Sequence, residues 1–227
     1  MPTPVRTLQP WSYLQSYYDG LYVGIDGLEG SGRSTVAASL QNKLQSAGYP
    51  AKIISPFPNT KTHKYISEIK HDRRLGIKSR HLIYASLFAI VTEHIILPHL
   101  AAGYIILSDR SWLSLYARAV AQGLDEQWVR TSLGFALMPD IIIEPQSDPI
   151  TALRRKLIMS EALDPLESGS DNETLEGFID FQSRMGQILH DIKPKTSWHV
   201  INIANPDALN HLVSTIIGQM EGRDVSS

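Results

Sequence analysis

Short apolar runs alternate with stretches of helical period along most of the chain. The apolar runs are continuous, and they predict strands at residues 21–26, 51–57, 104–108, 140–144 and 198–203. Apolar positions at helical spacing predict helices at residues 34–47, 62–72, 79–102, 111–137 in two pieces, 148–160, 173–191 and 206–221. Continuous apolar strands are typical of a parallel sheet covered on both faces, so the pattern predicts a doubly wound α/β fold with about five parallel strands.

Ligands of such folds bind outside the carboxyl ends of the strands. We therefore expect the chemistry of this chain to lie just after Asp26, Phe57, Ser108 and Glu144.

A glycine-rich turn, GLEGSGRST at residues 27–35, joins the first predicted strand to the first predicted helix. Glycines let successive backbone N–H groups curl inward, the helix presents its positive N-terminal end, and a serine hydroxyl can reach Mg²⁺. The alternative, a turn and helix start without a ligand, does not account for the glycine spacing. The turn predicts a loop for the phosphates of a nucleoside triphosphate, bound by Gly27, Gly30, Ser31, Gly32, Arg33, Ser34 and Thr35.

Arg33 stands where such a loop ordinarily carries lysine. A guanidinium keeps the charge and can fork across phosphate oxygens, but it is planar and bulkier than an ammonium group. We expect phosphate binding to tolerate this exchange more easily than catalysis does.

Length and composition restrict the remaining possibilities. A chain of 227 residues with 43% hydrophobic content can bury one full core, which favours a single domain. A net charge of −2 gives no basic face for long nucleic acid. The absence of cysteine excludes disulfides and thiolate chemistry, and the eight histidines show no paired metal-ligand spacing.

The first 20 residues read as an N-terminal extension without the basic start and apolar core of a secretory signal. The longest apolar stretch, residues 82–97, is interrupted by polar side chains and is short for a membrane span. We therefore expect a cytoplasmic protein with no membrane partner.

Several segments together resemble the thymidylate kinases, a family of P-loop nucleoside-monophosphate kinases. The resemblance rests on the phosphate loop with its internal acid Glu29, on the pair Phe57-Pro58, on residues 81–84, and on the pair Asp109-Arg110 followed by Ser114 and Ala117. It implies a P-loop kinase domain over residues 21–222 with a short lid at about 154–174, followed by a tail at 223–227.

The resemblance also implies the roles of individual residues. ATP and Mg²⁺ would be cofactors, with Ser34 and Asp109 at the metal, and a nucleoside monophosphate would be the substrate. The implied catalytic residues are Arg33, Asp109, Arg110, Arg154 and Arg155. The implied acceptor-binding residues are Glu29, Phe57, Pro58, Tyr84, Phe88, Arg110 and Ser114. Family members are usually homodimers, and the apolar helix predicted at 79–102 would suit such an interface.

Each role has a structural alternative. Asp109-Arg110 could be a helix cap beside a solvated arginine, Tyr84 could be ordinary core, and residues 154–156 could be an exposed helix face.

The chain departs from the family pattern on the acceptor side. Phe88 stands where the family carries an arginine that hydrogen-bonds the thymine edge, and Arg118 stands where an aromatic is typical. Three functions stay open: a kinase of dTMP, a related kinase with another nucleotide acceptor, and a non-catalytic nucleotide-binding homologue.

Overall fold

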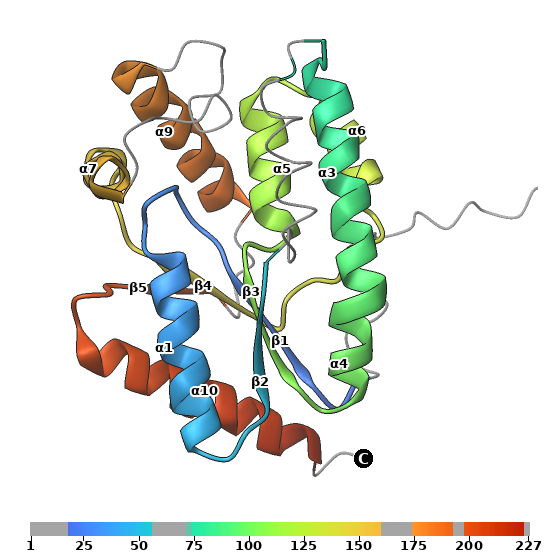
Figure 1. The fold of residues 1–227 in the computed structure, drawn as a ribbon, viewed down its shortest axis with the longest axis vertical. Helices are drawn as coiled ribbons and strands as arrows, with labels where there is room; N and C mark the ends of the chain where they lie inside the picture. The colour runs from blue at the N-terminus through green and yellow to red at the C-terminus, as the bar shows by residue number, and fades with distance from the viewer. Residues whose placement is uncertain (1–17, 56–71, 73, 160–173, 193–197, 225–227) are drawn as a thin grey trace, which may run out of the picture.

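Strand β1 (Leu21–Ile25) lies at the centre of an all-parallel sheet of five strands (Figure 1). The sheet order is β2 (Ala51–Ile54), β3 (Ile105–Asp109), β1, β4 (Ile141–Pro145), β5 (Trp198–Ile201). The computed structural model describes residues 18–55, 72, 74–159, 174–192 and 198–224. This confirms the predicted α/β fold with a five-stranded parallel sheet.

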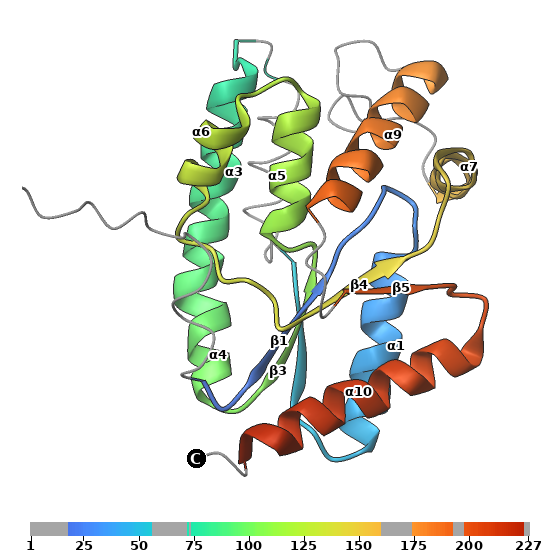
Figure 2. The same cartoon turned by 180° about the vertical axis from the view of Figure 1, so that it is seen from behind.

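Both faces of the sheet are covered by helices, which explains the continuous apolar strands (Figures 1 and 2). Leu21 and Val23 of β1 pack with α1 (Arg33–Ser46) and α10 (Pro206–Asp224). Tyr22 points to the other face and packs with the helices there. Those helices include α3 (Ile77–Val91), α5 (Trp112–Ala121), α6 (Glu126–Ser132) and α9 (Leu175–Asp191).

The observed boundaries lie within three residues of the predicted ones for most elements, including α7 (Pro149–Met159). Polar caps set several starts: Ser111 accepts from the Leu113 amide, Asp125 from Trp128, and Thr174 from Gly177. The helix predicted over 62–72 falls, except for Asp72, outside the described residues, as do Phe57 and Pro58.

The helix predicted over 79–102 is present, with an irregular turn in its interior. The segment is continuous from Ile77 to Ala101, but a π-helical turn, η1 (Thr92–Ile96), separates α3 from α4 (Leu97–Ala101). Pro98 has no N–H and would clash with the carbonyl four residues earlier in a regular α-helix. A wider turn just before it relieves that clash.

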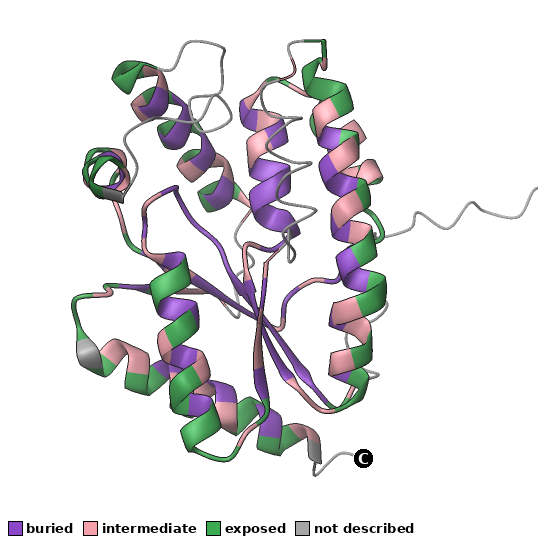
Figure 3. Ribbon diagram, viewed as in Figure 1, coloured by how far each residue is buried: buried purple, intermediate pink, exposed green. Residues whose placement is uncertain are grey.

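The stretch Ile77–Ala101 is, within the described ranges, the one helix long and apolar enough to cross a membrane by length and composition. Its inner side nevertheless belongs to the protein core, where Tyr84, Phe88, Ile96 and Leu100 pack together. Its apolar composition is therefore explained in part by burial within the fold. Figure 3 shows buried residues along the strands and on the inner sides of the surrounding helices.

Candidate active site

The loop between β1 and α1 has the backbone that its glycines predict. Gly27, Gly30 and Gly32 have φ angles of 148°, 72° and 97°, a region that L side chains rarely adopt. A side chain at Gly30 would also collide with the carbonyl of Ala152 on α7. Gly32 is the N-cap of α1 and has no side chain to cap it, so the helix start presents its N–H groups to a ligand.

The Arg33 side chain is directed back into this loop. Its Nη1 donates to the carbonyl oxygens of Gly27, at 2.5 Å, and Leu28, while Nη2 donates to Glu29 Oε2 at 3.2 Å. Its Nε lies 3.5 Å from Asp109 Oδ1. Burial and the charge of Arg110 lower the pKa of Arg33 from its ordinary value, although an arginine stays protonated in proteins. In this conformation Arg33 cross-links the phosphate loop to its surroundings.

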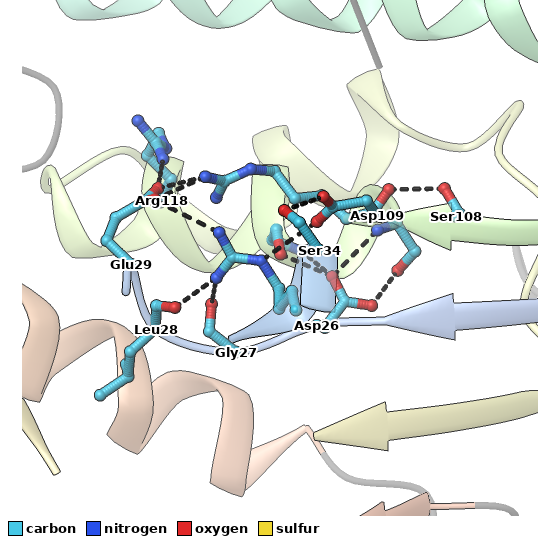
Figure 4. A network of polar contacts seen from close by, with 12 residues as sticks. Asp26, Gly27, Leu28, Glu29, Ser34, Ser108, Asp109 and Arg118 are labelled. Carbon is cyan, nitrogen blue, oxygen red and sulfur yellow. Dashed lines mark hydrogen bonds and ion pairs between the residues drawn. The ribbon is translucent and has the colours of Figure 1, made fainter. Parts of the chain in front are cut away.

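Glu29 is the centre of the charged network (Figure 4). Arg110 Nη2 donates to its Oε2 at 2.6 Å, and Arg118 Nη2 donates to its Oε1 at 3.0 Å. Burial by itself would raise the pKa of the Glu29 carboxyl, but the guanidinium groups of Arg110, Arg33 and Arg118 hold that pKa well below its usual range. Glu29 is therefore a carboxylate at neutral pH.

The residue at the end of β1, Asp26, fixes the start of α5. Its Oδ1 accepts from the amide of Ser111 at 3.0 Å and from Ser114 Oγ at 2.5 Å, and its Oδ2 accepts from Ser111 Oγ at 2.6 Å. The Ser114 amide also donates to Oδ1, at 3.2 Å. All three side chains are buried, so this cluster sets how the phosphate loop faces the segment after β3.

Ser34, in the first turn of α1, contacts Asp109, the last residue of β3. Ser34 Oγ donates to Asp109 Oδ2 at 2.6 Å, joining α1 to the end of β3. A hydroxyl and a carboxylate are oxygen ligands of the kind that Mg²⁺ prefers, and Mg²⁺ usually takes its other ligands from water and substrate phosphates. No cluster of three or more histidine, cysteine or acidic residues suitable for a metal occurs in the part of the chain that the structure describes. The pair fits a phosphate-assisted magnesium site.

Arg110 has an unusual backbone conformation, with φ at 79° for a residue that is not glycine. Its amide donates to the Ile25 carbonyl at 3.0 Å, and its own carbonyl accepts from Ser108 Oγ at 2.6 Å. Strain of this kind persists only where the surroundings hold it in place, and it is commonest at functional sites. The conformation turns the Arg110 side chain toward Glu29.

The predicted base-pocket residues lie in the core beside this network. Tyr84 and Phe88 on α3 are buried in the same cluster as Leu113 and Ala117 of α5. The Phe88 ring lies 6.3 Å from that of Phe135. Phe88 therefore offers apolar contact and no hydrogen-bond donor at this position.

Helix α7 carries two predicted catalytic arginines, and one of them contacts the phosphate loop. Arg155 Nη1 is 3.4 Å from the Ser31 carbonyl, whereas Arg154 is exposed. The rest of the predicted lid, residues 160–173, lies outside the described residues.

Three residues of this site had no assigned role in the sequence analysis: Asp26, Arg118 and Gln182. Gln182 on α9 is fully buried and accepts from the Glu29 amide through Oε1 at 3.0 Å. A buried glutamine in a helix of otherwise amphipathic pattern could have suggested a polar partner, but its spacing does not reveal which one.

Known proteins match the chain over most of its length. A family model described as thymidylate kinase matches residues 25–215. A protein of Saccharolobus solfataricus named probable thymidylate kinase 2 is 29% identical over 182 residues, covering 78% of this chain and 85% of that protein. A thymidylate kinase of Finegoldia magna is 31% identical over 159 residues, covering 67% of this chain and 78% of that protein.

The predicted family resemblance is confirmed. The matched range includes the phosphate loop, the Asp109–Arg110 pair and α7. The chain therefore belongs to the thymidylate kinase family, whose members are nucleoside-monophosphate kinases that use ATP.

Proposed function

We propose that this protein phosphorylates dTMP to dTDP, using ATP and Mg²⁺. The observation that carries the proposal is the contact between the phosphate loop and the end of β3, where Arg110 binds Glu29 at 2.6 Å and Ser34 binds Asp109 at 2.6 Å. These contacts bring a donor-phosphate loop, an acid and an acceptor-side arginine into one site. Phosphoryl transfer requires little more than positioning and charge neutralisation.

On the donor side, the backbone amides from Gly30 to Thr35 cradle the ATP phosphates. Ser34 and Asp109 would hold Mg²⁺, since their side-chain oxygen atoms lie within hydrogen-bond distance of each other. Bound there, Mg²⁺ would supply positive charge that offsets the negative charge of the ATP phosphates.

On the acceptor side, Arg110 holds the acceptor phosphate, whose oxygen attacks the γ-phosphorus without needing a general base. Glu29 faces the acceptor sugar, Tyr84 stacks on the base, and Phe57, Pro58 and Phe88 shape the pocket. Ser114 supports this pocket through its hydrogen bond to Asp26.

Arg33, Arg154 and Arg155 supply the remaining positive charge. Arg155 lies beside the phosphate loop, at the Ser31 carbonyl. Arg154 lies on the exposed side of α7, and closure of a lid over about 154–174 would bring its side chain to the phosphates. For Arg33 to bridge donor and acceptor, its guanidinium has to leave the carbonyls of Gly27 and Leu28.

Two observations favour the alternatives. Phe88 cannot donate to a base carbonyl, which favours a different or broader set of nucleotide acceptors. The engagement of Arg33 by its own loop favours a non-catalytic nucleotide-binding protein.

The proposal also covers domain organisation, oligomeric state and location. We propose that residues 21–222 form a kinase domain and that the protein is a cytoplasmic homodimer. The outer side of α3 exposes about half of the side chains of Leu82 and Ile90, a surface that a second copy would cover. Light scattering should show a dimer for the natural chain and a monomer for Ile90→Glu. Ile158→Glu, at an exposed position on α7, is the matched control and should leave the dimer intact.

A coupled assay of ADP release tests the activity, with ATP, Mg²⁺ and a panel of dTMP, dUMP, UMP, CMP, AMP and GMP. Turnover with dTMP above the others supports the proposal. Preference for another acceptor moves the activity to that nucleotide, and ATP binding without turnover on any acceptor identifies a non-catalytic homologue.

A further inference from the structure

Arg110 is, in the part of the chain that the structure describes, the one residue other than glycine with a positive φ. At 79° an L side chain is crowded by its own backbone, so the conformation persists only where neighbouring groups hold it. The residue directly follows β3 and directs its guanidinium to Glu29, with Nη2 2.6 Å from Oε2. The direction of this side chain therefore depends on whatever fixes the Arg110 backbone.

Two hydrogen bonds fix the Arg110 backbone, one on each side of its Cα atom. Its amide donates to the carbonyl of Ile25 in β1 at 3.0 Å, and its carbonyl accepts from the hydroxyl of Ser108 at 2.6 Å. The first bond continues the ladder between β1 and β3, so any residue except proline could make it at this position. The second bond requires a side-chain donor at position 108, two residues earlier along the chain.

Ser108 is buried behind the site, with 1% of its surface exposed. Tyr22 of the neighbouring strand β1 contacts it: burial raises the pKa of the Tyr22 hydroxyl, and the interaction with the Ser108 side chain offsets part of that effect. Removing one hydroxyl from such a place leaves a space too small for a water molecule. Solvent therefore cannot replace the bond from Ser108 to the Arg110 carbonyl.

We propose that Ser108 is a positioning residue for the acceptor-side arginine. Its hydroxyl holds the Arg110 carbonyl, and so sets where the guanidinium points when the phosphate of the nucleoside monophosphate arrives. This role rests on the proposed kinase function, in which Arg110 holds the acceptor phosphate. Since ATP is held by the amides of the phosphate loop in that proposal, Ser108 affects the affinity for the acceptor and not the affinity for ATP.

Isothermal titration of the full chain tests this role without relying on turnover. The natural chain and Ser108→Ala are titrated with dTMP and the other monophosphates of the panel, and separately with ATP. Losing the hydroxyl should weaken monophosphate binding by about 3- to 10-fold, the equivalent of one ordinary hydrogen bond, with ATP affinity unchanged within about twofold.

A double-mutant cycle with Arg110→Met determines whether Ser108 acts through the arginine. Arg110→Met removes the guanidinium and keeps a long, unbranched side chain on the same backbone. In that background Ser108→Ala should weaken monophosphate binding by less than about twofold further, because there is no guanidinium left to misplace. A residue that merely stabilises the fold would cost the same factor in both backgrounds.

Ser132→Ala is the matched control. Ser132 also donates to a backbone carbonyl, that of Val129 at 2.8 Å, but it belongs to α6 and makes its other contact with His81. The control variant should bind monophosphates and ATP as the natural chain does. If Ser108→Ala does not fold, a selective loss of monophosphate affinity in Ser108→Cys carries the test, because a thiol is a weak donor.

The outcomes separate the two proposals. Equal monophosphate affinity in the natural chain and the folded Ser108 variant overturns the role of Ser108 and leaves the proposed kinase function intact. The same loss in the natural and Arg110→Met backgrounds, or an equal loss for ATP and monophosphates, overturns that role as well. Full monophosphate affinity in Arg110→Met removes Arg110 from the acceptor site and with it the role of Ser108. A natural chain that binds none of the monophosphates overturns both proposals.

Discussion

Arg33 Nη1 donates to the carbonyl oxygen of Gly27 at 2.5 Å, so the residue at the usual lysine position is bonded to the loop that it follows. The same nitrogen also reaches the Leu28 carbonyl, and Nη2 reaches Glu29. A guanidinium can make these contacts at once because its five donors point outward in one plane.

Arg33→Lys should therefore destabilise the protein without raising its kinase activity. One ammonium group cannot reproduce the forked contacts, so we expect the free energy of unfolding to fall by about 1–3 kcal/mol. Urea denaturation and the ADP-release assay measure the two effects. A rate gain of tenfold or more would instead show that arginine had impaired a lysine site.

Asp26→Asn should be among the most damaging single substitutions. Asp26 accepts from the hydroxyls and amides of Ser111 and Ser114, and an asparagine NH₂ group would face donors. We expect a loss of about 2–4 kcal/mol in urea denaturation, because buried donors are left unsatisfied. Asp180→Asn, on the exposed side of α9, should change little; a loss of similar size there would argue against a specific role for Asp26.

The magnesium requirement should depend on Asp109. Replacing it with asparagine should weaken the magnesium site proposed at Ser34 and Asp109, so about 10- to 100-fold more Mg²⁺ should be needed for half-maximal ADP release. Asp191→Asn, far along α9, provides the control. An unchanged magnesium requirement in Asp109→Asn would remove this residue from the metal site.

His81 should make stability fall in mildly acidic solution. Burial lowers its pKa, and its Nε2 lies 2.7 Å from Ser132 Oγ, whose hydroxyl donates to the Val129 carbonyl. Nε2 thus carries the proton of a neutral ring. As pH falls below about 6.5, the unfolded chain binds a proton that the folded chain does not, so unfolding becomes easier.

His81→Gln keeps a donor for Ser132 but does not titrate. Its free energy of unfolding, measured between pH 5 and 7, should decline less steeply than that of the natural chain. His94→Gln, at an exposed position of η1, should keep the natural slope. Identical slopes for the natural chain and His81→Gln would contradict this assignment.

Arg223 should matter for stability and not for catalysis. At the end of α10 its Nη2 binds Asp140 Oδ1 at 2.5 Å, and its Nη1 binds the carbonyls of Gly20 and Tyr18. Gly20 and Asp140 directly precede β1 and β4, so these contacts lie at the amino ends of the strands, whereas the phosphate loop follows the carboxyl end of β1. Arg223→Met leaves Asp140 with its bond from the Tyr22 amide. We expect a loss of about 1–3 kcal/mol with unchanged kcat, compared with Arg184→Met; a fall in kcat for the folded variant would contradict this separation.

The sequence by itself determined the layers of this protein. Continuous apolar runs such as residues 21–25 are buried on both faces, which requires a sheet with helices on either side. Such a run is visible in the sequence of the strand itself, so the layers could be predicted without knowing any tertiary contact. The phosphate loop could also be predicted from adjacent residues, because Gly27, Gly30 and Gly32 have backbone angles that glycine readily adopts.

The tertiary structure decided which charged groups meet. Nothing in the spacing of Glu29 and Arg118 indicates their contact, and the same holds for Asp26 with Ser114, which are 88 residues apart. Such contacts depend on strand register and on how α5 packs against the sheet. The sequence predicted a helix that continues through Pro98, but not the π-helical turn Thr92–Ile96 that precedes this proline. Local patterns specify elements and burial, whereas the partners of a buried charge are set by packing between elements that are distant in sequence.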